Sequence, residues 1–449
     1  MKKISLKITL LFLTIISFVG CNDKLDLTDP TTLGVDQFIT DYASARTAMA
    51  RLYDNIQTYG TNQPVIVTQR MVSGLYADEL RHSGSFPTFT QALVNNILVD
   101  NISFTRIFAG HYNIINRATI IIRTVPGVAD LSSAQKEELI AEAKAVRAWS
   151  YFQLVKIYGG LPIIDKVFIL DGNAARDTPR SSEADVYSYI AAEIASAKGK
   201  LSSSNSNIYF TNDALSVLEA EVHLFMGNYN LAEPVLQSLI GKYTLDPNYA
   251  NLFALGNTSS STIFRINYNA SDSNSLAFNF TPTGRLEVAP SQALLNSFET
   301  GDTRKNLIAN NTIPLSAYIN KYTDNAEGKD LPYIYRYADV ILMYAEVLAR
   351  KNDANALTYI NMIRSRASLP ALTTFDSSNV VDVIARERNA EFFGEGKRWE
   401  DVKRLGLAQT VIGSKTGITF APKMLLWPIP QDELDANGAI SQADQNPGY

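Results

Sequence analysis

The sequence predicts an all-α fold with one long loop-rich region and a few short strands. Over much of the chain, apolar residues recur at intervals of three and four, and this spacing aligns them on one face of an α-helix. The clearest stripe runs from Tyr337 to Leu348. Between residues 244 and 332 that spacing fades, and Asn, Thr, Gly and Tyr residues predominate. A stretch this long without helices is usually functional or disordered, and its aromatic content argues against disorder.

In the N-terminal part, helical spacing begins near Val35. The stretch from residue 59 to residue 87 is rich in Gly, Asn, Gln and Ser, and only a short helix over 71–80 is expected there. A later helix starts with a capping signal at Ser132 or Ser133 and runs to Tyr158. The other helices predicted in this part span residues 102–123, 181–201, 212–227 and 229–243.

Two pairs of predicted helices resemble tetratricopeptide units, which stack into a scaffold. In the first pair, Gly227 closes one helix and Tyr229 opens the next. The second pair is formed by residues 337–348 and 356–369, and Leu369-Pro370 ends it. Within the loop-rich region, residues 262–268 and 275–281 are predicted as strands and residues 291–298 as a brief helix. The fold class predicted is therefore an all-α, tetratricopeptide-like scaffold.

The C-terminal part contains several distinctive motifs: Arg336 to Asp339, Tyr344 to Glu346, Ile363 to Ala367, Gly394 to Trp399, Leu425 to Leu434 and Asn446 to Tyr449. Together with residues 142–164, these motifs resemble the SusD/RagB family. The resemblance implies a surface lipoprotein that binds a nutrient, most often an oligosaccharide and in some members a peptide. It also implies that the protein is not an enzyme and that it delivers its ligand to a SusC-type TonB-dependent β-barrel of the outer membrane.

The N-terminus has the features of a lipoprotein signal peptide. A basic start is followed by an apolar run from Ile8 to Val19, which is too short to span a bilayer, and then by Gly20 and Cys21. Cys21 is the only cysteine, so an internal disulfide is excluded and lipidation at this residue is expected. The predicted localisation is the outer membrane, with a lipid anchor and exposure at the cell surface.

These observations predict the domain organisation. Residues 1–20 are the signal peptide, residues 21–34 are a tether, and residues 35–449 form one SusD-like domain. Within that domain the helical part covers about 35–243, the loop-rich, ligand-facing region about 244–332, and the part with the family motifs about 333–449. Without the basic signal peptide the formal charge of −5 becomes −8, which makes a nucleic-acid partner a poor expectation.

The sequence lacks the common catalytic motifs. His82, His111 and His223 are scattered, and no zinc-binding, phosphate-loop or serine-hydrolase pattern occurs, so no metal, cofactor or catalytic residue is expected. Glu387 and Glu391 share a helical face, as two acids of a glycosidase could. Nearby arginines would lower both pKa values, so we interpret the pair as part of an ion-paired network. An α-helical glycoside hydrolase or lyase, or a tetratricopeptide adaptor, remains the alternative function.

A ligand site is predicted where the loop segments 59–89 and 262–333 converge. Trp149, Trp399 and Trp427 fall in helical or motif segments and are expected in the core, so sugar stacking falls to Tyr and Phe residues. We expect Phe86, Tyr268 and Tyr333 to stack on sugar rings, and Arg81, Asn269 and Arg285 to hydrogen-bond hydroxyl groups. The other aromatic candidates in irregular segments are Tyr59, Tyr76, Phe89, Phe278, Tyr318 and Tyr322.

Overall fold

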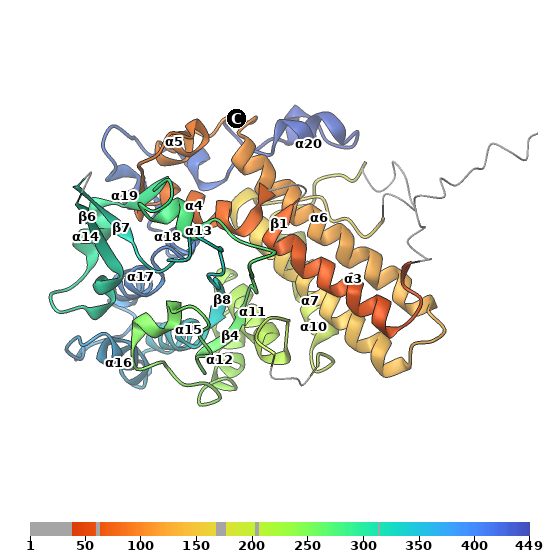
Figure 1. Ribbon diagram of the computed structural model, residues 1–449, viewed down its shortest axis with the longest axis horizontal. Coiled ribbons are helices and arrows are strands. Elements are labelled where there is room, and N and C mark those ends of the chain that lie inside the picture. Colours follow the sequence, from red (N-terminus) through yellow and green to blue (C-terminus); the bar gives the residue numbers. More distant parts are fainter. Residues whose placement is uncertain (1–37, 60–62, 168–176, 203–205, 313–314) are drawn as a thin grey trace, which may run out of the picture.

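The computed structural model describes residues 38–59, 63–167, 177–202, 206–312 and 315–449 (Figure 1). Within these ranges the protein is mainly α-helical and its strands are short, so the predicted all-α fold is confirmed. Long helices lie side by side in one half of the molecule, and shorter helices and strands form the other half (Figure 1). The predicted signal peptide, Cys21 and tether fall outside these ranges. None of the helices in them is both long and apolar enough to cross a membrane.

The long helices are α3 (Tyr42–Gln57), α6 (Ile102–Thr124), α7 (Ser133–Tyr158) and α10 (Glu183–Ala197). Helix α3 packs on α6, α6 on α7 and α7 on α10, as Figure 1 shows. The predicted cap of α7 is confirmed. The Gln135 amide donates to the Ser132 hydroxyl at 3.3 Å, and the Gln135 side chain accepts from the Ser132 amide at 3.0 Å. This reciprocal capping box satisfies backbone donors that the first turn leaves free.

Helix α4 is longer than the sequence indicated. It spans Val65–Tyr76 instead of 71–80, and it follows the short strands β1 (Thr58–Tyr59) and β2 (Gln63–Pro64). All of its residues are buried, so it has no polar face and its sequence shows no amphipathic spacing. Strand β3 (Leu80–His82) and helix α5 (Pro87–Leu93) come next, and the 3₁₀ turn η1 (Val125–Gly127) ends α6.

The predicted tetratricopeptide-like pairs are present. They consist of α11 (Asn212–Phe225) with α12 (Tyr229–Gln237), and of α15 (Tyr337–Arg350) with α16 (Ala356–Arg366). Gly227 closes α11 with a φ of 72°, a left-handed conformation that glycine adopts at little cost. Because α12 packs on α15, the two pairs stack on each other although they are far apart in the sequence.

The loop-rich region contains more regular structure than its composition indicated. Its elements are η2 (Tyr249–Phe253), β4 (Thr262–Arg265), α13 (Leu276–Phe280), β5 (Val288–Pro290), α14 (Gln292–Ser297), η3 (Thr303–Leu307), β6 (Ile308–Thr312), β7 (Leu315–Ile319) and β8 (Tyr333–Arg336). Among the described residues, four antiparallel two-stranded sheets join β1 to β2, β3 to β5, β4 to β8 and β6 to β7. The predicted helix over 291–298 is confirmed as α14.

Two predictions for this region are wrong. The segment 275–281 was expected to be a strand, but it forms helix α13, in which Leu276, Ala277 and Phe280 are buried at helical spacing while Phe278 points to solvent. The segments 308–312 and 315–319 were expected to be loops, but they form the antiparallel strands β6 and β7. Strand β6 is mostly polar, but β7 alternates Leu315, Ala317 and Ile319 with Ser316 and Tyr318, so the sequence held a short strand signal that the prediction missed.

The C-terminal elements pack against the N-terminal helices. They are α17 (Val380–Phe392), α18 (Arg398–Arg404), α19 (Ala408–Gly413), η4 (Pro422–Leu425), α20 (Gln431–Ala436) and η5 (Gln442–Asp444). The Trp427 amide donates to the Ile157 carbonyl at 2.8 Å, which ties the last segment to the end of α7. Trp149, Trp399 and Trp427 are all buried, so their predicted core role is confirmed. Tyr76 of α4 contacts both Trp399 and Trp427 edge-on.

Candidate functional site

The structure brings the two predicted loop segments together at strands β3 and β5. These strands pair antiparallel, with Arg81 opposite Ala289 and His82 opposite Val288. The turn that follows β3, residues 83–86, therefore lies beside the segment that leads into β5. This juxtaposition of segments about two hundred positions apart in the sequence defines the surface on which the candidate site is built.

At the centre of this surface an exposed aromatic ring is held by an arginine. Phe86 is 42% exposed and precedes helix α5. The guanidinium carbon of Arg285 lies 4.2 Å from the centroid of the Phe86 ring, and its Nη2 donates to the Ser85 hydroxyl at 2.9 Å. Both side chains reach solvent, and each restricts the movement of the other. We call Phe86, Ser85 and Arg285 the Phe86–Arg285 site.

A buried carboxylate fixes the turn that carries Phe86. Oε1 of Glu287 accepts hydrogen bonds from the Ser85 and Phe86 amides at 2.9 and 2.8 Å, and it lies 2.9 Å from His82 Nε2. Oε2 of Glu287 lies 3.3 Å from Arg285 Nη2. Burial opposes ionisation of this carboxylate, but the hydrogen bonds from His82, Phe86 and Ser85 outweigh it and lower the pKa of Glu287 below its ordinary value.

The turn approaches Glu287 so closely that only glycine fits at position 84. A Cβ added to Gly84 would lie 2.2 Å from the carboxyl carbon of Glu287. The amides of Ser83 and Gly84 also donate to the Glu287 main-chain oxygen at 3.0 Å each. Glu287 was not predicted from the sequence, because a single acidic residue before a short strand has no distinctive local pattern.

A second exposed aromatic residue lies beside Arg285. The Arg285 amide donates to the Phe278 carbonyl at 2.7 Å, and Phe278 is 41% exposed. Arg81 is partly exposed in β3, and within the described ranges its side chain makes no hydrogen bond or ion pair. Three predicted ligand contacts, Phe86, Arg285 and Arg81, thus lie on the predicted surface. Phe278, one of the other aromatic candidates, lies there too.

The other three predicted ligand contacts, Tyr268, Tyr333 and Asn269, do not contribute to this surface. The prediction that Tyr268 and Tyr333 stack on sugar rings is wrong, because both rings are buried. Tyr268 and Tyr333 are only 4% and 2% exposed. The Tyr333 hydroxyl donates to the Leu252 carbonyl at 2.6 Å and accepts from the Asn257 side chain at 2.7 Å, so its ring is a core element. Asn269 is exposed, but its side-chain oxygen accepts from the Ser271 amide at 2.9 Å and shapes a tight turn. Aromatic rings in loop-rich sequence are buried here because neighbouring segments fold over them.

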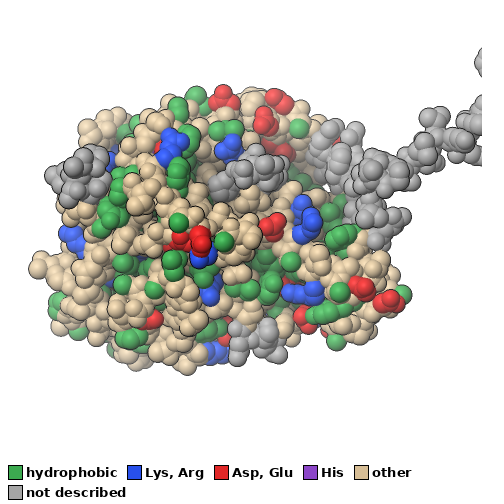
Figure 2. Space-filling model, in the orientation of Figure 1, with side chains coloured by type: hydrophobic (Ala, Val, Ile, Leu, Met, Phe, Trp, Pro, Cys, Tyr) green, Lys and Arg blue, Asp and Glu red, His purple; other side chains and the backbone are tan. Residues whose placement is uncertain are grey.

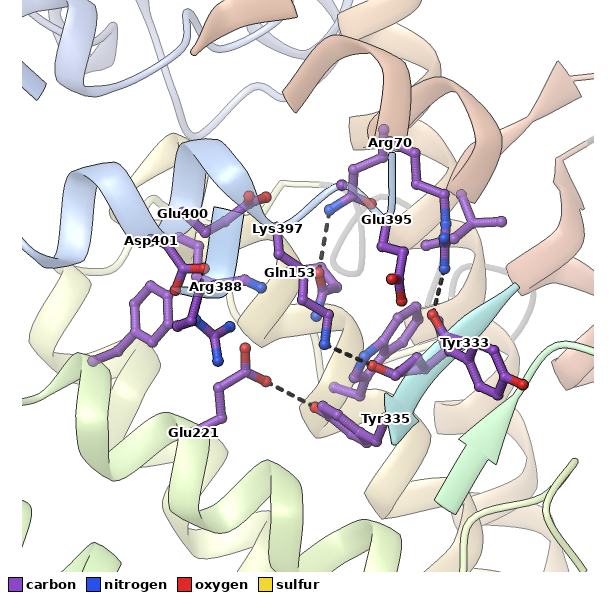
Figure 3. A pocket seen from close by; sticks show the side chains of 17 residues that line it. Arg70, Gln153, Glu221, Tyr333, Tyr335, Arg388, Glu395, Lys397, Glu400 and Asp401 are labelled. Atoms are coloured by element: carbon purple, nitrogen blue, oxygen red, sulfur yellow. Dashed lines mark hydrogen bonds and ion pairs between the residues drawn. The ribbon is translucent and has the colours of Figure 1, made fainter. Parts of the chain in front are cut away.

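Figure 3 shows a different feature, a small polar cavity between β8, α4, α7 and the α17–α18 turn. In it the Tyr335 hydroxyl donates to Glu221 at 3.0 Å, and Lys397 donates to the Ile334 carbonyl at 3.1 Å. The volume is about 50 Å³, which suits a few water molecules and is too small for a sugar. This cavity is therefore not the ligand site.

The acidic pair Glu387 and Glu391 lies in a buried ion network. The carboxylate oxygens of Glu391 lie 3.4 Å from a guanidinium nitrogen of Arg304 and 2.5 Å from one each of Arg336 and Arg366. A carboxylate oxygen of Glu387 lies 3.1 Å from Arg304, and Glu387 also pairs with Arg364. Burial opposes ionisation, but these guanidinium groups hold the pKa of Glu391 well below its usual range. A general acid of a glycosidase needs the opposite shift, a raised pKa. The pair therefore has the geometry of the predicted ion network.

The cationic partners of this network are not the ones closest in sequence. Arg388 pairs with Asp401 at 2.7 Å, Arg398 with Asp78 at 2.7 Å, Arg386 with Glu299 at 3.3 Å, and Lys397 pairs with Asp339. The partners of Glu387 and Glu391 come instead from η3, β8 and α16. The network thus joins the loop-rich region to the C-terminal helices, so it stabilises the contact between segments remote in sequence.

The described side chains hold no cluster of metal ligands, and the face drawn in Figure 2 has no basic stripe. In the ranges given above, no three His, Cys, Asp or Glu side chains are grouped so that they could hold a metal ion. His111 is buried near Lys156. Its burial, and to a smaller extent the positive charge of Lys156, lower the pKa of His111 to about 3, so the ring is neutral. On the face drawn in Figure 2, cationic and anionic side chains are interspersed, and no basic stripe appears.

Two family models match the chain. A model described as the SusD family matches residues 268–449, and a model described as starch-binding associating with outer membrane matches residues 25–218. The chain is similar to SusD-like protein P38 of Formosa agariphila, with 25% identity over 98% of this chain and 99% of that protein. It is also similar to a SusD-like protein of Bacteroides ovatus, with 27% identity over 88% of this chain and 82% of that protein.

Solved structures share the fold. A SusD superfamily protein from Bacteroides vulgatus matches with a TM-score of 0.82 and 21% identity, over 92% of this chain and 100% of that one. Surface glycan-binding protein A from Bacteroides thetaiotaomicron, solved in complex with laminarihexaose, matches with a TM-score of 0.78 and 20% identity, over 90% of this chain and 99% of that one. At these identities the likeness establishes the architecture of the chain.

Proposed function

This chain belongs to the SusD/RagB family, and from that membership we propose that it binds an oligosaccharide at the cell surface and passes it, unchanged, to a SusC-type TonB-dependent transporter. The observation that carries the binding part is the exposed Phe86 ring clamped by Arg285 above the buried Glu287. The laminarihexaose complex of a structural neighbour is consistent with an oligosaccharide as the class of ligand.

The chemistry of the Phe86–Arg285 site suits a sugar. The apolar face of a pyranose ring packs on an aromatic face, while guanidinium N–H groups donate to hydroxyl oxygens. Because Ser85, Glu287 and Arg285 already hold the ring in place, little side-chain entropy is lost when a sugar binds. An open surface with one or two stacking contacts should bind weakly, with Kd roughly micromolar to millimolar, which allows release to a transporter.

The lack of catalysis is part of the proposal. A glycoside hydrolase needs a carboxyl group with a raised pKa beside the bond that it cleaves, whereas Glu287 at the Phe86–Arg285 site has a lowered pKa, as Glu391 of the buried network does. A tetratricopeptide adaptor would not need an exposed aromatic ring braced by a buried carboxylate. Neither alternative accounts for the Phe86–Arg285 site.

We also propose that Cys21 carries the lipid anchor, with residues 21–34 as a tether and residues 35–449 as the binding domain. This places the protein at the outer membrane, exposed at the cell surface, and a tether would let the domain move over its transporter partner. The support is the order of basic, apolar and small residues before Cys21, together with family membership.

The experiment is an array of oligosaccharides and peptides probed with the purified domain, followed by chromatography of each bound compound after overnight incubation. The proposal expects an oligosaccharide to bind and to be recovered intact. Binding of peptides alone would change the ligand class, and shortened products would restore the hydrolase or lyase alternative.

A further inference from the structure

We propose that a cleft at the end of helix α3 binds a single neutral sugar ring, as a carbohydrate contact separate from the Phe86–Arg285 site. We call it the α3 cleft. It lies between α3, the segment 206–210 and the chain that follows β4, and its volume is about 180 Å³. Its principal lining residues are Tyr53, Asp54, Gln57, Tyr209, Asn267 and Asp272. The inference goes beyond the proposed loop site and shares with it only the class of ligand.

One wall of the α3 cleft is aromatic and rigidly held. The rings of Tyr53 and Tyr209 meet edge to face, with centroids 5.0 Å apart at 74°, and the Tyr53 ring meets Phe264 at 6.3 Å. The Phe210 amide donates to the Tyr53 hydroxyl at 2.8 Å. The Arg46 guanidinium lies 5.3 Å from the Tyr209 centroid. Such fixed, partly exposed rings offer an apolar surface to a sugar ring at low entropic cost.

The other wall is polar and supplies acceptors. The Gln57 side chain donates to the Asn267 carbonyl at 2.8 Å, which ties the last turn of α3 to the 266–272 loop. Asp54 and Asp272 both face the cleft, and neither forms an ion pair within the part of the chain that the structure describes. Burial, and then the charge of Asp54, raise the pKa of Asp272. The Gln57 side chain also hydrogen-bonds to Asp272, and sugar hydroxyls could add further donors to Asp54 and Asp272.

The size and the charge of the cleft select the ligand. Pockets for drug-sized ligands measure about 300–1,000 Å³, so a cleft of about 180 Å³ takes one ring and not an extended chain. The charged residues that line the cleft are Asp54, Asp272 and one cation, Arg265, whose guanidinium donates to the Asn257 carbonyl at 2.6 Å. Two carboxylates against one guanidinium leave the cleft net negative, so it disfavours an anionic sugar. The predicted ligand is therefore a neutral monosaccharide unit, and a uronate or a sulfated sugar should be rejected.

The test uses saturation-transfer NMR with D-glucose, D-galactose and D-mannose, each compared with D-glucuronate, on the wild-type domain and on Tyr209→Ala, Asp272→Asn and Phe86→Ala. At least one neutral sugar should bind, and glucuronate should bind at least about tenfold more weakly. Tyr209→Ala and Asp272→Asn should each weaken binding about tenfold. That is the effect expected when one ring contact, or one hydrogen bond to a charged group, is lost. Neutral-sugar binding should persist in Phe86→Ala, because the lining of the α3 cleft does not include Phe86.

The inference is overturned if none of the three neutral sugars binds, if glucuronate binds as well as they do, or if binding survives both cleft substitutions. It is also overturned if Phe86→Ala abolishes monosaccharide binding while Asp272→Asn does not. Asp272→Asn keeps the side-chain shape, so it decides the matter if Tyr209→Ala does not fold. Failure of the proposed function would appear separately, as the absence of any bound oligosaccharide on the array.

Discussion

The guanidinium group of Arg285 lies over the ring of Phe86 at 4.2 Å, and the two residues lie at the same end of the β3–β5 strand pair, one after β3 and the other before β5. Neither residue would be fixed without the other segment. Phe86 stands on a turn whose amides bind Glu287, and Arg285 leads into the strand that follows Glu287. These contacts hold the exposed Phe86 ring in a fixed position. Little side-chain entropy is then lost when a sugar stacks on it, so a small contact area can still bind.

The close contact between Gly84 and Glu287 gives the first prediction. Gly84→Ala should weaken oligosaccharide binding about as much as removal of the Phe86 ring, because a Cβ 2.2 Å from the carboxyl carbon must displace the turn. Titration calorimetry measures the affinity, and circular dichroism shows that the helical scaffold is retained. Gly127→Ala is the matched control, since its Cβ would meet no atom within 4 Å. Equal affinity of the Gly84 variant and the wild type would show that the turn does not position the ligand.

The buried network gives a prediction for stability. Glu391→Gln should lower the free energy of unfolding by about 3–5 kcal/mol, because it leaves buried arginines without their counter-charge. Urea unfolding at pH 7 measures the loss. Glu327→Gln is the control, since Glu327 pairs with Lys329 on the surface and such pairs contribute about 0–1 kcal/mol. A Glu391→Gln variant with unchanged stability but a lost hydrolytic activity would reverse the structural assignment.

The lowered pKa of Glu391 predicts how stability depends on pH. The folded protein keeps this carboxylate ionised below the ordinary glutamate pKa of about 4.3, whereas the unfolded chain protonates it there. The stabilising contribution is therefore fully present above about pH 4.3 and is lost as the pH falls below that value. The difference between wild type and Glu391→Gln should be constant from about pH 5 to pH 7 and should narrow towards about pH 3. A difference that stays constant or widens in acid would contradict the shift.

Cys21 gives a prediction about anchoring that depends on the sequence alone. The wild-type protein should fractionate with outer membranes, and Cys21→Ala should be released or remain unprocessed. Mass spectrometry of the mature N-terminus checks the modification directly. An unmodified mature N-terminus that begins at another residue would exclude the lipoprotein assignment.

Most helices could be predicted from the sequence because their exposed faces are polar. Helices α3, α6 and α10 are buried on one face and show this spacing, whereas α4 is buried at every residue and could be predicted only in part. Helix α15 is also buried from Tyr337 to Ala349, but its apolar residues recur at helical spacing and indicated the helix. Helix α13 was mistaken for a strand because five residues are too few to separate helical from alternating spacing. Strand β6 is mostly polar, and the alternating apolar residues of β7 are too few to give a strong strand signal.

The site could be predicted in part for similar reasons. Phe86 stood out because Gly84 and Pro87 mark a turn around it, and turns are exposed. Burial of Tyr268 and Tyr333 depends on segments that fold over them, and local sequence does not encode that. The partners of Glu391 come from η3, β8 and α16, so nearness in sequence indicated the wrong arginines. Contacts between remote segments decide these features.

The most direct test of the central claim is a calorimetric titration of wild type, Phe86→Ala and Phe38→Ala with the oligosaccharide that binds most strongly on the array. Phe38 is the matched control, because it is 39% exposed, close to the 42% of Phe86, and lies before α3. The account predicts Kd roughly micromolar to millimolar for wild type and Phe38→Ala, weaker binding by about tenfold or more for Phe86→Ala, and intact oligosaccharide afterwards. Unchanged affinity in a folded Phe86→Ala variant, or cleaved oligosaccharide, would contradict it.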